Sequence, residues 1–122
     1  MARESIVHSL TRSAGVDLLT HKYRCVKFSG GNLVKAGDGD AVVGVLQNKA
    51  DVGEEAVYAR EGKTKGEAGS AIAEGDIVAS DANGKFKTAG SGDHPVGTAA
   101  TAATADGSIF EVELNITLTP QA

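Results

Sequence analysis

Aromatic side chains are scarce in this sequence. Its 122 residues include no tryptophan, two tyrosines and three phenylalanines, alongside 16 glycines. The interior must therefore be built from small and β-branched side chains, chiefly alanine and valine. Because full burial of one valine or leucine contributes only about 1.5–3 kcal/mol, such a core favours a protein that gains stability by associating with a partner.

Cysteine is nearly absent as well. The single Cys25 lies in a strand-like run between Arg24 and Val26, so no intramolecular disulfide can form. This excludes a disulfide-stapled secreted scaffold and a cysteine zinc site. We expect Cys25 to be a half-buried thiol that fills space.

No basic stripe and no long apolar run are present. The sequence has twelve Lys and Arg residues and sixteen Asp and Glu residues, which gives a net charge of −4, and the basic residues are scattered. A nucleic-acid surface would need clustered positive charge, so we expect no nucleic-acid partner. The N-terminal sequence MARESIVHSLTRSAG lacks the apolar stretch of a signal peptide, and we expect a soluble protein made in a cytoplasm, with no membrane partner.

Alternation of apolar and polar residues indicates an all-β fold. Residues 110–118, FEVELNITL, place apolar side chains on one face and polar ones on the other, which predicts one long strand. Shorter runs bounded by Gly, Asp or Asn predict further strands at 23–28, 41–47, 55–60, 75–80 and 84–88. Residues 98–105, TAATAATA, have no large apolar face, and we interpret them as strand running into a loop, with a short helix as the alternative.

The chain repeats itself at a shift of 53 to 54 residues. GNLVKAGDGDAVVG, from Gly31, and NGKFKTAGSGDHPVG, from Asn83, share turn glycines, one aspartate and a Val-Gly pair. We therefore expect a single β domain at 15–122, made of two pseudo-repeats at about 15–60 and 69–114. The composition predicts a small Gly/Ala-rich β-barrel or β-sandwich-like domain, and leaves open whether the two units form one barrel or two.

Residues 1–14 precede both units and are predicted to form an extended N-terminal arm. This segment mixes apolar residues with arginines. One interpretation is a frayed terminus or an added edge strand, and the other is a segment that becomes ordered against a partner.

The repeated loops are the obvious place to look for a metal or for catalysis. Asp38 and Asp40 lack the spacing of a calcium loop, and the second copy has Ser91 where the first has Asp38. His8, His21 and His94 fall in no metal-binding or nucleophile motif. We predict an acidic turn in place of a metal site, no cofactor, and no enzymatic activity.

The order of these motifs resembles that of the capsid cement, or head decoration, proteins of tailed phages. AGSAIAEGDIVASDANGKFKTAGSGDHPVGTA, followed by ADGSIFEVEL, carries the resemblance, and residues 16–59 look like a more divergent copy of the same unit. The divergence is at the opening, where His21 and Lys22 stand in place of Gly75 and Asp76.

The resemblance implies a structural virion protein made in the host cytoplasm. Such a protein decorates the outer surface of an expanded icosahedral head of HK97-type major capsid protein and bridges its subunits, often as a trimer at three-fold or quasi-three-fold sites. For capsid contact we single out the arm, with Arg3, Ile6, Val7, Leu10 and Arg12. The alternative is a small carbohydrate- or host-surface-binding β module, although the sequence lacks the aromatic platform that such modules use.

Overall fold

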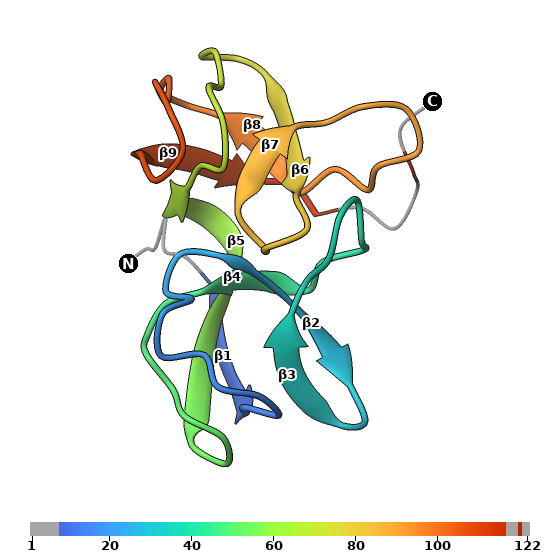
Figure 1. Cartoon of the computed structure of the whole chain (residues 1–122), viewed down its shortest axis with the longest axis vertical. Coiled ribbons are helices and arrows are strands. Elements are labelled where there is room, and N and C mark those ends of the chain that lie inside the picture. The colour runs from blue at the N-terminus through green and yellow to red at the C-terminus, as the bar shows by residue number, and fades with distance from the viewer. Residues whose placement is uncertain (1–7, 117–119, 121–122) are drawn as a thin grey trace, which may run out of the picture.

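The computed structural model describes residues 8–116 and residue 120, and in this part of the chain every regular element is a strand (Figure 1). The described residues include no helix long and apolar enough to cross a membrane. The strands belong to one antiparallel sheet, which confirms the all-β prediction. They are β1 (His8–Ser13), β2 (Cys25–Ser29), β3 (Asn32–Lys35), β4 (Gly44–Leu46), β5 (Glu55–Glu67), β6 (Ile77–Ser80), β7 (Phe86–Thr88), β8 (Gly97–Ala99) and β9 (Ile109–Leu114).

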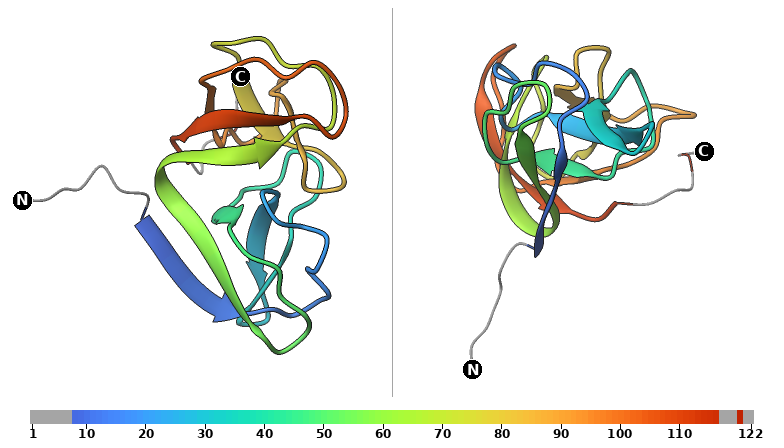
Figure 2. Two further views of the ribbon diagram at one scale, coloured as in Figure 1. Left: turned by 90° about the vertical axis from the view of Figure 1, so that its left-hand side faces the viewer. Right: turned by 90° about the horizontal axis from the view of Figure 1, so that it is seen from below.

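Strand β5 joins the two halves of the molecule. Its 13 residues bend at the middle, so that its first half belongs to the β1–β4 part and its second half to the β6–β9 part (Figure 2). Glycine 62 lies at the bend with a φ of 91°, in the left-handed region that other residues rarely adopt. The sheet is therefore continuous from one half to the other, in the order β3-β2-β4-β5-β9-β8-β6-β7.

The two halves have the same connectivity. The first half of β5 pairs with β1 and β4, and β9 pairs with the second half of β5 and with β8. One parallel bridge in each half, Ala14–Leu33 and Ala68–Phe86, joins the end of the first strand of that half to a later strand, so each half of the sheet is curled. The two units therefore form one continuous sheet, which is curled into a half-barrel at each end.

The core consists of small and β-branched side chains, as the composition predicts. Its larger cluster draws residues from both halves and contains Phe86 and Phe110, whose rings meet edge to face with centroids 5.4 Å apart. A second cluster fills the first half-barrel around Leu18, Leu33 and Tyr58. Cys25 is completely buried, and not half-buried as the sequence suggested.

One predicted strand is shorter than expected. The alternation over residues 110–118 predicts a strand that reaches Leu118, but β9 ends at Leu114, and residues 117–119 lie outside the described part. The edge of β5 explains where β9 stops. Leu114 is opposite Gly62, and the next residue of β5, Glu61, is already opposite His8 of β1.

Candidate functional site

In each repeated acidic loop an aspartate closes a turn. The Asp40 carboxylate accepts a hydrogen bond from the Gly37 N–H at 2.7 Å, and the Asp93 carboxylate accepts one from the Gly90 N–H at 2.8 Å. The same side chain thus closes the same turn in each half. This confirms the correspondence of Asp40 with Asp93 that the sequence repeat predicts, and it shows why one aspartate is kept in each copy.

Lysines also bind these carboxylates, at the same Oδ2 atom of Asp40 and of Asp93 that accepts the main-chain N–H. Lys27 binds Asp40 at 2.7 Å, while Lys87 lies 2.7 Å from Asp38 and 3.1 Å from Asp93. The Lys27 ammonium, followed by the Gly37 N–H, lowers the pKa of Asp40. Across the described residues, no group of three or more His, Cys, Asp or Glu side chains is arranged to hold a metal ion.

The histidines take part in local structure. The main-chain N–H of His94 donates to the carbonyl oxygen of Gly39 at 3.1 Å, and its ring Nδ1 lies 2.9 Å from the same oxygen, so His94 ties one repeated loop to the other. Partial burial, followed by the charge of Arg24, lowers the pKa of His21. His8 is the first residue of β1, and its main chain is opposite Glu61 of β5.

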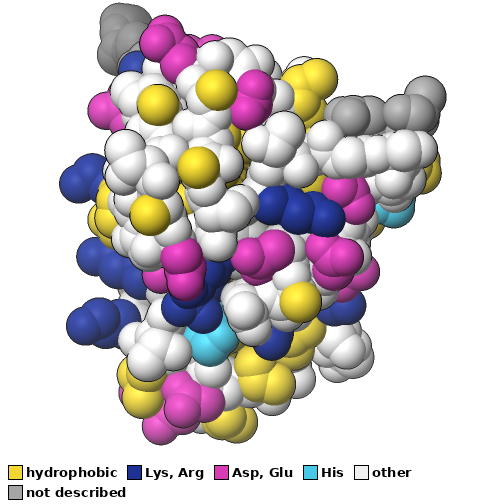
Figure 3. All heavy atoms as spheres, turned by 45° about the horizontal axis from the view of Figure 1, so that its top comes forward, with side chains coloured by type: hydrophobic (Ala, Val, Ile, Leu, Met, Phe, Trp, Pro, Cys, Tyr) yellow, Lys and Arg dark blue, Asp and Glu magenta, His cyan; other side chains and the backbone are white. Residues whose placement is uncertain are grey.

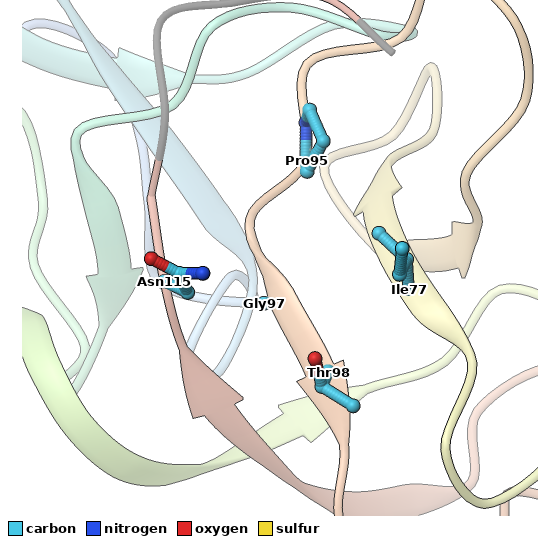
Figure 4. Close-up of a pocket in the computed structure, with 5 residues that line it drawn as sticks. All are labelled: Ile77, Pro95, Gly97, Thr98 and Asn115. Carbon is cyan, nitrogen blue, oxygen red and sulfur yellow. The ribbon is translucent and has the colours of Figure 1, made fainter. Parts of the chain in front are cut away.

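Two hollows lie near the end of β9. The first measures about 210 Å³ and is lined by Ile77, Pro95, Gly97, Thr98 and Asn115 (Figure 4). It presents a hydroxyl, an amide and an apolar side chain, with no titratable group. The second, of about 410 Å³, is formed by Arg60, Glu61, Leu114, Asn115 and Ile116 at the bend of β5.

Two of the predicted contact residues lie on an apolar surface of the first half-barrel. The Arg12 guanidinium lies 4.0 Å from the centre of the Phe28 ring and donates to the Gly31 carbonyl at 3.3 Å. Phe28 meets the buried Tyr58 edge to face at 5.9 Å, and Leu10 is the cross-strand partner of Tyr58. Leu10 is 43% exposed and Phe28 40% exposed. We call Leu10, Arg12, Phe28 and Tyr58 the β1 patch.

The other predicted contact residues, Arg3, Ile6 and Val7, lie outside the described residues. Sequence reasoning did not single out Phe28. A signal was available, because Phe28 alternates with Val26 and both belong to the apolar face of one short strand. The second half has Ser80 in the register of Phe28, so the patch belongs to one half only.

Charges on the surface are mixed. On the face in Figure 3, Lys and Arg side chains lie among Asp and Glu side chains, and single small apolar groups lie scattered over its upper part. All five aromatic residues fall within the described part, and Phe28 is the one with a large exposed fraction. One ring covered on one face by Arg12 does not form the platform that glycan-binding modules use.

Fold and surface together describe an all-β protein whose exposed groups are suited to contacts with other macromolecules. The sequence profile of the phage cement protein family matches residues 19–115, and the chain belongs to that family. It is therefore a structural, capsid-associated phage protein, as the motif order predicts.

Among solved structures, the crystal structure of the head fiber gp8.5 N base of bacteriophage phi29 has the same fold. It aligns with a TM-score of 0.68 and 16% identity, over 93% of this chain and 99% of the other. No curated protein sequence matches the chain.

Proposed function

We propose that this protein binds the outer surface of an expanded icosahedral head of HK97-type major capsid protein and bridges neighbouring subunits. The observation that carries the proposal is the family match over residues 19–115. The β1 patch supports it further, because a partly exposed phenylalanine held by an arginine has the composition of an interface anchor.

Bridging of capsid subunits requires binding contacts and no chemical reaction. A protein that binds the expanded shell and not its alternatives stabilises that shell by RT ln(1 + [L]/Kd), which is about 2.7 kcal/mol when the free concentration is 100 times Kd. Repetition of a modest contact over a symmetric lattice multiplies this effect. A chain with a thin core and a mixed surface charge is suited to this role, because it gains stability from the shell and stays soluble without it.

The contact consists of the N-terminal segment and the β1 patch. Arg3, Ile6 and Val7 precede β1 in the chain, and Leu10 and Arg12 are part of it. A segment with apolar residues directly before an edge strand in the sequence is suited to adding a strand to a capsid sheet, where main-chain hydrogen bonds supply affinity and alternate side chains fix the register. We further propose a trimer at three-fold or quasi-three-fold positions, which presents three such segments to neighbouring capsomers.

Truncation tests the assignment of the contact. A variant that lacks residues 1–10 is expected to stay folded and to lose co-sedimentation with expanded capsids, and full-length protein is expected to bind expanded capsids more tightly than unexpanded ones. Ile109→Ser is the matched control, because Ile109 is 52% exposed and belongs to the second half-barrel. Binding of the truncated protein at full strength, with a normal thermal unfolding curve, would overturn the assignment.

A further inference from the structure

The first half-barrel covers one end of the second through a contact inside the chain. The Cys25 N–H donates to the Gly84 carbonyl oxygen at 2.7 Å, and the Gly39 N–H donates to the Ser80 carbonyl oxygen at 2.9 Å. The larger core cluster extends through this contact, because residues of the second half share it with four residues of the first, which are Cys25, Ala36, Val42 and Val45. The first half therefore presents a covering side, and the second half a covered side.

The covering side of the first half has a counterpart on the second. Cys25 and Ile77 are equivalent, because each directly precedes a valine that pairs with the repeated glycine of a neighbouring strand. The main-chain oxygen of each also accepts a hydrogen bond from the alanine that begins the following loop, at 3.0 Å in the first half and 2.8 Å in the second. In the same register the counterparts of Cys25, Val42 and Val45 are Ile77, Pro95 and Thr98.

This counterpart on the second half is an exposed surface. Cys25, Val42 and Val45 are all buried, whereas Ile77 is 48% exposed and Thr98 is exposed as well. The hollow of about 210 Å³ described above lies on this surface (Figure 4). A surface that is covered in the first half is thus open in the second, and we call it the Ile77 face.

The covered side of the second half has an exposed counterpart on the first. Ser80 is completely buried, and Thr64, whose hydroxyl accepts a hydrogen bond from the Gln47 amide at 2.9 Å, is 7% exposed. By strand register the counterparts of these two residues are Phe28 and Leu10, which are 40% and 43% exposed. The β1 patch therefore corresponds to a surface that the second half buries against the first.

We propose that this contact is repeated between molecules, with the β1 patch of one copy bound to the Ile77 face of a second copy. Within the chain, burial and the Asp81 charge raise the pKa of the Cys25 thiol, and a hydrogen bond with the Ser80 side chain opposes them, so Ser80 lies beside Cys25. Between copies Phe28 takes the place of Ser80, and the side chain that it meets is Ile77. The hollow of about 210 Å³ beside Ile77 can receive the ring, because cavities of about 150 Å³ bind benzene.

Two different surfaces meet in this contact, so it is heterologous. Copies joined in this way form either a closed ring or an open chain. The inference rests on the function proposed above for the number of copies: in the proposed trimer, three copies close a ring in which contacts within chains alternate with contacts between chains. The capsid then meets each β1 patch at a junction between two copies.

The ion pairs of the contact within the chain are not repeated between copies. Arg24 binds Glu67 at 2.8 Å, and Lys87 binds Asp38 at 2.7 Å, and both pairs join the two halves. Their counterparts, in the same order, are Asp76, Ser13, Val34 and Ser91. These side chains form neither ion pair, so the contact between copies depends on apolar groups. Self-association is therefore expected to change little when the NaCl concentration is raised.

Two variants of the full-length protein, each with one altered surface, test the proposal by sedimentation. Wild-type protein is expected to form oligomers as its concentration increases. Phe28→Ser and Ile77→Asp are each expected to weaken self-association by about tenfold or more. Ile109→Asp is the matched control, because Ile109 is 52% exposed on the same half-barrel as Ile77, and it is expected to associate as the wild type does. Thermal unfolding shows whether each variant is folded.

Mixing the two variants tests whether the contact is heterologous. The Phe28→Ser protein keeps an intact Ile77 face, and the Ile77→Asp protein keeps an intact β1 patch. An equimolar mixture is therefore expected to form dimers at concentrations at which either variant alone stays monomeric. A mixture that stays monomeric, variants that associate as tightly as the wild type, or a wild-type protein that is monomeric at every concentration would each overturn the proposal.

Expanded capsids separate this inference from the proposed function. If both hold, Phe28→Ser and Ile77→Asp each weaken capsid binding, because an oligomer engages the shell at several points and a monomer at one. Loss of self-association with unchanged capsid binding would leave the contact between copies standing and would count against the trimer on the capsid. Loss of capsid binding by Phe28→Ser with unchanged self-association would overturn this inference and leave Phe28 as a direct capsid contact.

Discussion

Gly97 lies against the main chain of Glu113, so closely that a Cβ at position 97 would clash with the Glu113 carbonyl oxygen. The equivalent residue of the first half, Gly44, has the same relationship to Ala59. These glycines belong to the Val-Gly pair that recurs in the sequence. They allow the main chain of β4 to lie against that of β5, and the main chain of β8 against that of β9, at a distance that no side chain permits.

Alanine at either glycine is expected to destabilise the fold. Gly97→Ala forces the backbone of β8 away from β9, and overpacking of this kind costs about 1–3 kcal/mol. Thermal or urea unfolding measures the loss. Gly90→Ala is the control, since a Cβ there would stand 3.5 Å from Asp93, an ordinary contact, and a change within about 0.5 kcal/mol is expected. Equal losses at 97 and 90 would contradict the explanation.

The aspartates that close the repeated turns are expected to make stability depend on pH. The Gly90 N–H, followed by the Lys87 ammonium, lowers the pKa of Asp93 below its ordinary value of 3.8. The folded protein therefore holds this carboxylate ionised more strongly than the unfolded chain. Its contribution to stability is complete above the ordinary pKa and is lost as the pH falls through the folded value.

Asp93→Asn should thus lower the melting temperature at pH 7, and the difference from wild type should shrink towards pH 2. Asp38→Asn provides the comparison. Asp38 also binds Lys87, but its side chain is 63% exposed, and an ion pair this close to water contributes little. A difference that stays constant from pH 7 to pH 2 would show that the charge of Asp93 is not the cause.

The thiol of Cys25 is expected to stay unreactive in the folded protein. It is completely buried, and burial, followed by the charge of Asp81, raises its pKa. Because the thiolate is the reactive form, labelling with an aromatic disulfide at pH 8 should follow the rate of unfolding. The reagent should react within minutes in guanidinium chloride. Equally rapid labelling without denaturant would mean that β2 opens far more easily than its core position suggests.

Local sequence signals predict much of this fold, because many of its rules are local. The alternation of β9 from Phe110 to Leu114, the turn aspartates and the Val-Gly pairs each depend on a few neighbouring residues. The second half of β5 is different. Its sequence GKTKGE is charged and glycine-rich, like a linker, and it is a strand because β9 pairs with it along its whole length.

The candidate contact surface was predictable only in part, for the same reason. Leu10 and Arg12 stand out in the sequence as apolar and basic residues near the N-terminus. Phe28 becomes important only through Arg12 and Tyr58, which are 16 and 30 residues away along the chain. Nothing in the sequence near Phe28 indicates that β1 will lie beside it. Contacts between distant segments decide which apolar residues are covered and which stay exposed.

The β1 patch yields the sharpest prediction for the proposed function. Phe28→Ser gives the first half-barrel the residue that the second half has at the same register, Ser80, so the strand itself should tolerate it. The ring is 40% exposed, and its loss should cost the free protein little stability. If the ring is an anchor of the capsid interface, the variant should lose about 1–2 kcal/mol of binding, which is roughly a fivefold to thirtyfold weaker Kd for expanded capsids.

Arg12→Gly makes the corresponding change on β1, where the second half has Gly66. It removes the guanidinium from the Phe28 ring and should weaken capsid binding in the same direction. Because Arg12 and Phe28 touch, the double variant should lose less than the two single losses together. Ile109→Ser, on the other half-barrel, should leave Kd unchanged. If both patch variants fold and bind capsids normally, the capsid contact lies elsewhere on the surface.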